Sequence, residues 1–190
     1  MRTIENRLQE VYDKLKTKKL SETQSLGNGL KFFIFDYDPE DEEKVYNYFE
    51  TYLNVKDDFH LRIVDVYDCI INILKEKGYL EKVYKMEKEK GIDYTNGVIT
   101  STIGVGSSRD LLLNEITKDL KKDEILVLKG IGKCFGVVRA HTILSNLEKV
   151  VDENPVLLLY PGGYDENGLR LFNKLKPNDY YKAIQLVYKK

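Results

Sequence analysis

Short apolar runs, separated by longer amphipathic segments, recur along the chain. They occupy residues 30–35, 61–66, 125–128, 156–160 and 183–188. Three of these five runs are almost continuously apolar, which is typical of strands that helices cover on both faces. The alternation of strand-like and helix-like segments predicts a single α/β domain over residues 1–190, with a mostly parallel central sheet. We expect about five strands in a three-layer arrangement, Rossmann-like or P-loop-like in its winding.

Helix signals fill the segments between the runs. Residues 1–19 place their apolar side chains on one face, which predicts an amphipathic amino-terminal helix that packs on the domain or on a partner. The first helix has the stripe Ile4, Leu8, Val11 and Leu15, and the next has Val45, Tyr48, Phe49 and Tyr52. The second of these stripes belongs to a helix predicted over residues 39–52. Further helices are predicted over residues 68–77, 80–90, 108–120, 136–148 and 166–174. Glycines break the periodicity of residues 85–109, so we expect an insertion or a mobile loop there.

The composition is that of a soluble, reduced, globular protein. Hydrophobic residues make up 42% of the chain and charged residues 32%, and no apolar stretch is long enough to cross a bilayer. The amino terminus lacks the apolar core of a signal peptide, so we expect a cytoplasmic protein with no membrane partner. The two cysteines and two histidines fit neither a disulfide framework nor a zinc site, and we predict no metal and no cofactor.

Positive and negative side chains balance in number but not along the chain. The sequence has 30 Lys and Arg against 31 Asp and Glu. Residues 36–58 hold nine acidic and two basic side chains, whereas residues 170–190 hold six basic and one acidic. Opposed patches of this kind favour docking to other proteins or head-to-tail homo-oligomers, and solvated helix surfaces are the alternative. Direct DNA binding by this protein alone is not expected, since a basic stripe with stacking aromatic residues is absent; the carboxyl-terminal stretch is where DNA would bind.

Two carboxylates follow the first apolar run, in the segment FDYDPED. Asp36 and Asp38 would lie at the carboxyl end of a strand, where α/β sheets gather their ligands. They are candidate partner-binding residues, and such a pair could hold Mg²⁺. The simpler interpretation is that Asp38 caps the following helix and Asp36 accepts hydrogen bonds from loop amides. The segment falls short of the Asp-x-Asp loop of haloacid-dehalogenase phosphatases, because Glu40 stands where those enzymes have Thr or Val.

A glycine-rich turn, KGIGKCFGVVRAH, lies between a predicted strand and a predicted helix. Backbone amides at such a turn bind anions, and nearby basic side chains add charge. The candidate phosphate- or nucleotide-binding residues are Gly130, Gly132, Lys133 and Arg139. The turn matches neither a P-loop, which needs Gly in place of Val127, nor a dinucleotide loop, which needs Gly in place of Phe135. A tight turn that needs Gly for its backbone conformation is the alternative.

Three other side chains have chemistry of their own. Cys134 could be an activated thiolate near a helix amino terminus, although a buried, unreactive thiol is the commoner case. His141 could act as a base, although a histidine in such a position more often forms a hydrogen bond with a backbone carbonyl group. His60 has no assigned role. No combination completes a catalytic motif, so we predict that the protein is not an enzyme.

The segment YPGGYDENGLRLF follows another predicted core strand. Residues 161–163 predict a turn that leads into the next helix. Tyr164, Asp165 and Arg170 are candidate partner-binding residues, since exposed Tyr and Arg are frequent at interface hot spots. A plain connection between strand and helix is the alternative.

Several of these segments together resemble a known family. They are FDYDPED at 35–41, VYD at 66–68, GIG at 130–132, RAHTILSNL at 139–147, YPGGYD at 160–165, LRLF at 169–172 and YYKAIQL at 180–186. In this order they resemble the BrxB family, small subunits of bacterial BREX (bacteriophage exclusion) systems. The similar blocks span residues 32–187, and the group RAH, YPG-x-YD and LRLF is specific.

The resemblance implies a cytosolic part of a multi-protein antiviral defence system, encoded beside a methyltransferase, a large ATPase and a PglZ-type protein of the alkaline-phosphatase superfamily. It implies no catalytic residue. We therefore expect a non-catalytic adaptor that binds a PglZ-like protein and other BREX components through a polarised or Tyr-rich surface. The alternative is a nucleotide- or phosphate-binding protein that uses the degenerate glycine-rich loop at 130–136.

Overall fold

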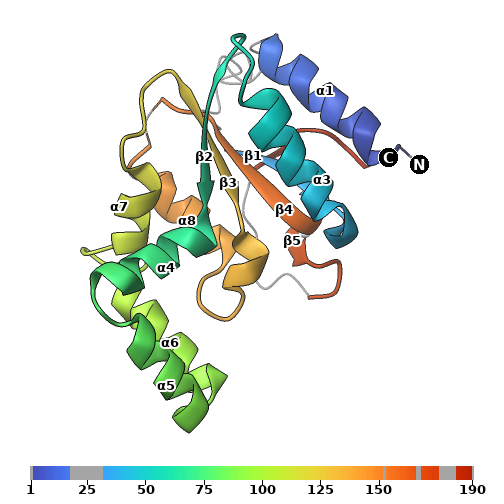
Figure 1. Cartoon of the computed structure of the whole chain (residues 1–190). Coiled ribbons are helices and arrows are strands. Elements are labelled where there is room, and N and C mark those ends of the chain that lie inside the picture. Colours follow the sequence, from blue (N-terminus) through green and yellow to red (C-terminus); the bar gives the residue numbers. More distant parts are fainter. Residues whose placement is uncertain (1, 18–31, 152, 166–167, 176–182, 190) are drawn as a thin grey trace.

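The computed structural model describes residues 2–17, 32–151, 153–165, 168–175 and 183–189, and its elements alternate as predicted (Figure 1). The strands are β1 (Phe32–Tyr37), β2 (His60–Asp65), β3 (Glu124–Lys129), β4 (Val156–Asp165), β5 (Gly168–Leu171) and β6 (Ile184–Gln185). The helices are α1 (Ile4–Lys16), α3 (Glu42–Asn47), α4 (Val66–Glu76), α5 (Leu80–Lys90), α6 (Ile92–Ile103), α7 (Leu111–Thr117) and α8 (Ala140–Leu147), with shorter pieces η1 (Pro39–Asp41), η2 (Tyr48–Leu53) and η3 (Ile131–Cys134). In the described part of the chain, no helix has the length and apolar character needed to span a membrane.

Parallel strands form the central sheet, which the described residues arrange in the order β2-β3-β4-β1-β6. The short strand β5 pairs antiparallel with the end of β4. The predicted α/β class, with a mostly parallel sheet of about five strands, is therefore confirmed. The strand order differs from the 3-2-1-4-5-6 order of a Rossmann sheet, because β1 lies between β4 and β6.

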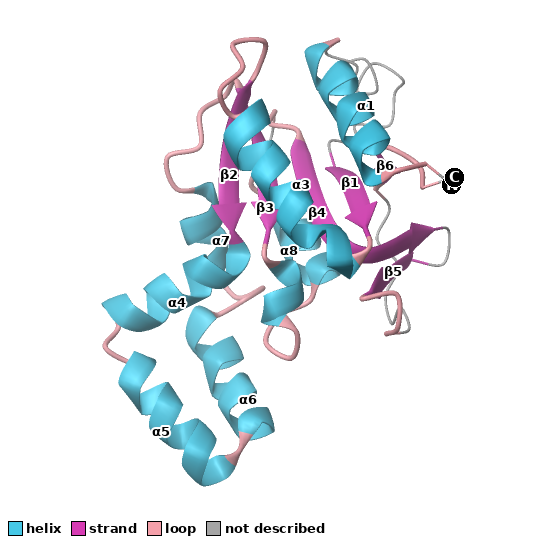
Figure 2. Ribbon diagram, turned by 45° about the vertical axis from the view of Figure 1, so that its right-hand side comes forward, coloured by secondary structure: helices cyan, strands magenta, loops and turns pink. Residues whose placement is uncertain are grey.

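Helices cover both faces of this sheet, as Figure 2 shows. Alternate side chains of β1 point to opposite faces, so Phe32 and Ile34 join one hydrophobic core while Phe33 and Phe35 join the other. Side chains of α4, α7 and α8 complete the first core, and those of α1, α3 and η2 complete the second. Burial on both faces explains why the strand sequences are almost continuously apolar.

The predicted amino-terminal helix is present as α1, and it packs on the domain. Thr3 is its N-cap and accepts a hydrogen bond from the Asn6 N–H (3.3 Å). The predicted apolar stripe is buried, with all four side chains at 8% exposure or less. The carboxyl-terminal segment lies beside α1, because Lys14 Nζ donates a hydrogen bond to the Leu186 carbonyl oxygen (2.6 Å).

The predicted helix over residues 39–52 forms in three pieces. The 3₁₀ turn η1 leads into α3, and α3 continues into the π-helix η2. The wider turn of a π-helix shifts the buried stripe along the chain. Val45 and Phe49 are buried as predicted, but Leu53 takes the next buried position and Tyr52 is 40% exposed.

Residues 85–109 do not form the predicted loop. They contain the end of α5 and all of α6, which form a helical hairpin (residues 80–103), here called the arm. Gly91 (φ +79°) separates the two helices, and Gly104 (φ +65°) ends α6 in the left-handed conformation. The arm extends away from the sheet (Figures 1 and 2). The mobile-loop alternative was wrong for residues 85–103, because glycines at helix ends give the same local signal as glycines in a loop. The insertion alternative stays a prediction.

Residues 168–174 do not form the predicted helix, and residues 166–167 of that prediction lie outside the described residues. The strand β4 continues through the predicted turn at 161–163, and β5 returns beside it with Gly162 opposite Leu171. A Cβ atom at Gly162 would lie 2.1 Å from the Arg170 carbonyl oxygen, so glycine is needed for the two strands to approach. Arg170, expected on a helix, therefore lies on β5.

Candidate functional site

The carboxyl ends of β1, β2 and β3 lie at one edge of the sheet, here called the carboxyl edge. Asp36 and Tyr37 end β1, Asp65 ends β2, and the glycine-rich turn begins at Gly130 directly after β3. This is the edge at which α/β sheets bind their ligands. The contacts of each polar group there decide what the edge can bind.

Asp36 is buried in an ion pair with Arg7 of α1. Arg7 Nη2 lies 3.0 Å from Asp36 Oδ1 and 2.9 Å from the Val187 carbonyl oxygen, and the two side chains are only 4% and 2% exposed. The Gln185 side chain also donates to Asp36 Oδ1, and the Tyr164 N–H donates to Oδ2. Burial lowers the pKa of the Arg7 guanidinium, and the charge of Asp36 opposes that shift. The expected loop amides are not its partners: the backbone amide that bonds Asp36 is that of Tyr164 on β4.

Asp38 precedes the helical turn η1 as predicted, but its carboxylate does not cap that turn. Asp38 Oδ1 instead accepts hydrogen bonds from Asn173 Nδ2 (2.8 Å) and Lys189 Nζ (2.9 Å). Lys189 Nζ also donates to the Gly162 carbonyl oxygen (2.7 Å). The hydrogen bond from Lys189 holds the pKa of Asp38 below its usual value. The capping interpretation was wrong because more distant donors, from two other segments, reach this carboxylate.

The glycine-rich turn makes close contacts within the fold. Gly130 has a left-handed backbone (φ +77°), and a Cβ atom there would lie 2.1 Å from Asp65 Oδ1. The Gly130 N–H donates to the Tyr46 hydroxyl (2.9 Å), so this amide already has a partner. A Cβ atom at Gly132 would lie 3.0 Å from the Phe172 ring. The interpretation of a tight turn that requires glycine is confirmed at Gly130.

Basic side chains at this turn face carboxylates. Lys133 Nζ lies 3.7 Å from Asp65 Oδ2, and Lys129 Nζ lies 3.5 Å from the same oxygen and 2.7 Å from Glu50 Oε1. Burial lowers the pKa of Lys129, but the two carboxylates outweigh it and the net shift is upward. Arg139 is the N-cap residue of α8. A phosphate bound here would meet the charge of Asp65, although nucleotide binding by this loop stays a prediction.

Asp65 is a structural residue that the sequence reasoning missed. Its Oδ1 accepts hydrogen bonds from the backbone N–H groups of Tyr67 (3.0 Å) and Asp68 (3.4 Å), which makes it the N-cap of α4. Helix α4 was expected to begin only at residue 68. An Asp between an apolar strand and an apolar helical stripe is the signal that could have found this cap.

The cysteine and histidine side chains at or near the turn have contacts within the fold. Cys134 is buried, and burial raises the pKa of its thiol to about 12. The expectation of a buried thiol is confirmed, and this burial counts against an activated thiolate. His141 Nε2 lies 3.2 Å from Thr142 Oγ1, and exposed His60 lies 3.7 Å from Asp123. Within the described ranges, no three His, Cys, Asp or Glu side chains are grouped to hold a metal ion.

The β4–β5 hairpin carries the other three predicted partner-binding residues. The Tyr164 hydroxyl donates to the Ala183 carbonyl oxygen (2.8 Å) and accepts from the Ala183 N–H (3.0 Å), so Tyr164 ties the hairpin to the segment before β6. Asp165 and Arg170 form an ion pair with each other, and their side chains are 34% and 49% exposed. Both remain accessible at the surface, whereas Asp36 does not.

Ion pairs neutralise part of the predicted acidic stretch 36–58. The pairs are Asp36 with Arg7, Asp38 with Lys189, Glu50 with Lys129, and Asp58 with Lys16. One of them joins the predicted acidic stretch directly to the predicted basic stretch 170–190. Residues 176–182 and 190, which contain several of the basic side chains, lie outside the described residues.

The comparison with known proteins identifies the family. A profile of the family described as "BREX protein BrxB" matches residues 62–186, which is more than half of the chain. The chain belongs to the BrxB family. A "BREX protein BrxB" of Bacillus cereus (strain H3081.97) is 39% identical over 192 residues, which cover 100% of both chains. A "BREX protein BrxB" of Escherichia coli O9:H4 (strain HS) is 26% identical over 185 residues, which cover 97% of this chain and 92% of that protein. No solved structure gives a significant match.

The BrxB match can be placed on the fold. It runs from β2 to β6, so it includes the glycine-rich turn, the β4–β5 hairpin and the arm. Helix α1 and strand β1, with Arg7 and Asp36, lie before the matched region. The Bacillus relative aligns with the whole chain, so the likeness extends to these elements. The resemblance noted in the sequence is thereby confirmed.

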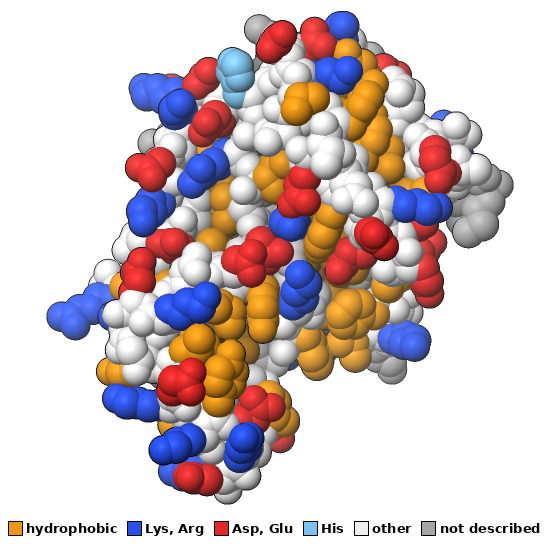
Figure 3. All heavy atoms as spheres, in the orientation of Figure 1, with side chains coloured by type: hydrophobic (Ala, Val, Ile, Leu, Met, Phe, Trp, Pro, Cys, Tyr) orange, Lys and Arg blue, Asp and Glu red, His pale blue; other side chains and the backbone are white. Residues whose placement is uncertain are grey.

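The arm carries exposed aromatic side chains that the sequence reasoning missed. Tyr79, directly before α5, and Tyr84, Ile92 and Tyr94 on the arm are between 41% and 53% exposed. Figure 3 shows hydrophobic side chains gathered where α4 meets the arm, with charged side chains around them. Large aromatic residues within an otherwise charged segment are the signal that could have found this BrxB surface.

Proposed function

We propose that this BrxB-family protein is a non-catalytic subunit of a BREX defence complex, working in the cytoplasm as an adaptor that binds a PglZ-like protein. Family membership supports the BREX setting, since both relatives have BREX in their names. The observation that carries the adaptor role is the exposure of aromatic side chains at the surface. Polar groups at the carboxyl edge contact one another, whereas Tyr79, Tyr84 and Tyr94 on or beside the arm are 41% to 50% exposed, and Phe135 of the glycine-rich turn is 60% exposed.

The charged groups at the carboxyl edge hold the fold together. A catalytic acid or base must reach its substrate, but the side chains of Asp36 and Asp65 are only 2% and 7% exposed. Asp36 joins α1 and the carboxyl-terminal segment to β1, and Asp65 caps α4. These structural roles support a subunit that performs no reaction at this edge.

The same contacts count against the nucleotide alternative. A phosphate-binding turn after a strand presents free backbone amides and basic side chains. Residues 36–41, at the end of β1 and in the turn after it, instead contain four carboxylates, and the Gly130 amide after β3 is bonded to Tyr46. Lys133 forms an ion pair with Asp65, whereas the lysine of a phosphate-binding loop contacts the phosphate.

The arm is retained although it contributes little to the core. Val83 is the buried residue of α5, and Thr95 and Ile103 are those of α6. Most helical stability in proteins comes from packing an apolar face. Two helices with so little buried surface and several exposed aromatic side chains are typical of an interaction surface.

Co-purification with the PglZ-like protein of the same operon tests the adaptor role. The tagged chain and that protein would be co-expressed, then separated by size-exclusion chromatography with light scattering at about 10 μM, and we expect one peak containing both. Light scattering of the chain alone would detect a homo-oligomer. An unrelated alkaline phosphatase serves as the matched control and should elute separately. Separate elution from the PglZ-like protein and from every other BREX component would refute the proposal.

Thermal unfolding separates this proposal from nucleotide binding. A ligand at a hundred times its dissociation constant adds about 2.7 kcal/mol to the stability, which corresponds to roughly 5 to 10 °C for a domain of this size. We expect no such shift with ATP, GTP or dinucleotides in the presence of Mg²⁺. A shift of that size would favour the phosphate-binding alternative at residues 130–136.

A further inference from the structure

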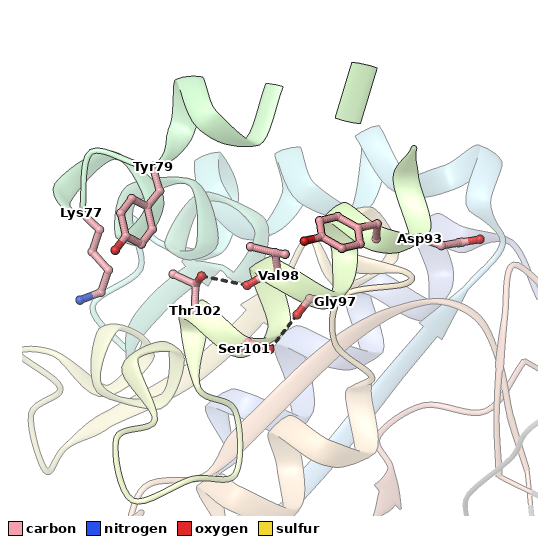
Figure 4. Close-up of a pocket in the computed structure, with 8 residues that line it drawn as sticks. Lys77, Tyr79, Asp93, Gly97, Val98, Ser101 and Thr102 are labelled. Atoms are coloured by element: carbon pink, nitrogen blue, oxygen red, sulfur yellow. Dashed lines mark hydrogen bonds between the residues drawn. The ribbon is translucent and has the colours of Figure 1, made fainter. Parts of the chain in front are cut away.

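The arm bears an open groove of about 680 Å³. It is lined by residues from the end of α4 through α6, namely Lys77, Tyr79, Asp93, Tyr94, Gly97, Val98, Ser101 and Thr102. In Figure 4 Tyr79 and Asp93 lie on either side of Gly97, Val98, Ser101 and Thr102 of α6, which form the floor. Tyr94, the neighbour of Asp93, also lines the groove. The groove lies apart from the carboxyl edge and shares none of its residues.

The two hydroxyl groups on the floor of the groove form hydrogen bonds within α6. Ser101 Oγ donates to the Gly97 carbonyl oxygen (2.9 Å), and Thr102 Oγ1 donates to the Val98 carbonyl oxygen (2.8 Å). Both hydroxyl groups are therefore turned back onto α6, as the dashed lines in Figure 4 show. A surface of this kind offers contact area and close approach rather than free hydrogen-bond donors.

Gly97 has no explanation within the free protein. It lies inside α6, away from both helix ends, where glycine is less stable than alanine. A Cβ atom added there would meet nothing within 4 Å, so neither the packing nor the backbone requires glycine. By contrast, Gly130 and Gly162 leave no room for a Cβ atom. Because Gly97 has no side chain, another molecule can approach the backbone of α6 closely at this point.

The walls of the groove are aromatic and are held in place by cations. Tyr79 and Tyr94 are 41% and 50% exposed. Lys82 Nζ lies 5.0 Å from the centre of the Tyr79 ring, and Lys90 Nζ lies 4.5 Å from the centre of the Tyr94 ring. Lys90 Nζ also donates to the Tyr94 hydroxyl (3.4 Å). Exposed, oriented tyrosines beside a close-approach floor are typical of interface hot spots.

We infer that this groove receives an α-helix of the partner protein, packed across Gly97 and against Tyr79 and Tyr94. Helices approach closely where small residues such as Gly and Ser face them, and the lining residues of α6, from Asp93 to Thr102, extend about 14 Å along the helix. Lys77 and Asp93 lie at opposite ends of the groove in Figure 4. Charge complementarity therefore calls for a helix with an apolar face, a carboxylate at the Lys77 end and a Lys or Arg at the Asp93 end.

This inference rests on the proposed function, and one binding series separates the two. The binding of the purified PglZ-like protein would be measured by calorimetry for wild type, Gly97→Ala and Tyr94→Ala, with Tyr67→Ala as the control. Tyr67 is 39% exposed but lies at the start of α4, outside the groove. We expect Gly97→Ala to raise the melting temperature by roughly 1 to 4 °C and to weaken binding at least about tenfold, because the added methyl group blocks close approach.

The outcomes of the series differ for the two ideas. Tyr94→Ala should also weaken binding at least about tenfold, since it removes an aromatic wall, and Tyr67→Ala should bind like wild type. Wild-type affinity in both groove variants would overturn the groove while leaving the adaptor role intact. No binding by wild type would overturn both. Because Gly97→Ala should have a raised melting temperature, a loss of binding by this variant cannot be attributed to unfolding.

Discussion

Removing one member of the Arg7–Asp36 pair should destabilise the protein strongly. The Arg7 guanidinium is 4% exposed, and the substitution Asp36→Asn removes the negative charge beside it. An amide oxygen can still accept a hydrogen bond there, and the Val187 carbonyl oxygen and the Phe35 ring (4.6 Å from Arg7 Cζ) stay in contact, but the buried positive charge loses its carboxylate partner. Breaking a buried pair in this way costs about 3 to 5 kcal/mol. Arg7→Met should lower the free energy of unfolding by about 3 kcal/mol, the lower end of this range, because Asp36 keeps its hydrogen bonds from Gln185 and Tyr164.

The double variant Arg7→Met/Asp36→Asn isolates the coupling between the two charges. It buries no unpaired charge, so we expect it to cost at least about 2 kcal/mol less than the sum of the single variants. Urea unfolding followed by circular dichroism at pH 7 gives these free energies. Lys44→Gln is the control, because the Lys44–Glu5 pair is 60% and 64% exposed, so its loss should leave the free energy of unfolding close to that of wild type. Single variants that cost under about 1 kcal/mol, or costs that simply add, would refute this account of the pair.

Three further predictions concern the glycine-rich turn and its surroundings. Gly130→Ala should cost more than about 2 kcal/mol, because it combines a left-handed backbone with a Cβ atom 2.1 Å from the Asp65 carboxylate; Gly78→Ala, with φ +66° and open space, should cost only about 1 kcal/mol, and equal costs in urea unfolding would contradict the contact. The thiol of Cys134, with its pKa raised to about 12, should react with a thiol reagent at pH 8 only after unfolding, and rapid labelling of the native protein would show that it is accessible. A hydrogen bond from a lysine lowers the pKa of Asp38, so this bond should stabilise the fold at pH values above the unfolded pKa of 3.8 and be lost as the pH falls through the folded pKa. The difference in free energy of unfolding between wild type and Asp38→Asn should therefore shrink towards pH 3, and a constant difference would rule this out.

The sheet and its covering helices could be predicted because their signals are local. A strand buried on both faces must be apolar along its length, and Leu157 to Leu159 in β4 show this directly. The hairpin after β4 could not be predicted in the same way. Gly162 and Gly163 resemble a turn in sequence, but the pairing with β5 makes them a strand, and pairing between strands leaves no local trace.

The candidate site shows the same limit. The position of Asp36 at the end of β1 was predictable from the apolar run before it. Its burial was not, because Arg7 and Gln185, which bond it, are 29 and 149 residues away in the sequence. The arm was missed for a different reason, since Gly91 and Gly104 mark helix ends by a left-handed backbone that the sequence letters alone do not distinguish from a loop.

The hydrogen bond from Arg7 to Val187 joins residues 180 positions apart. During synthesis, Asp36 and Arg7 leave the ribosome long before the segment that completes their hydrogen bonds. Contacts of such long sequence separation form late, because the intervening chain must first be ordered. A chain that lacks Val187 would therefore bury the Arg7–Asp36 pair without the carbonyl oxygen that Arg7 bonds, and we expect its free energy of unfolding to be lower than that of the full sequence.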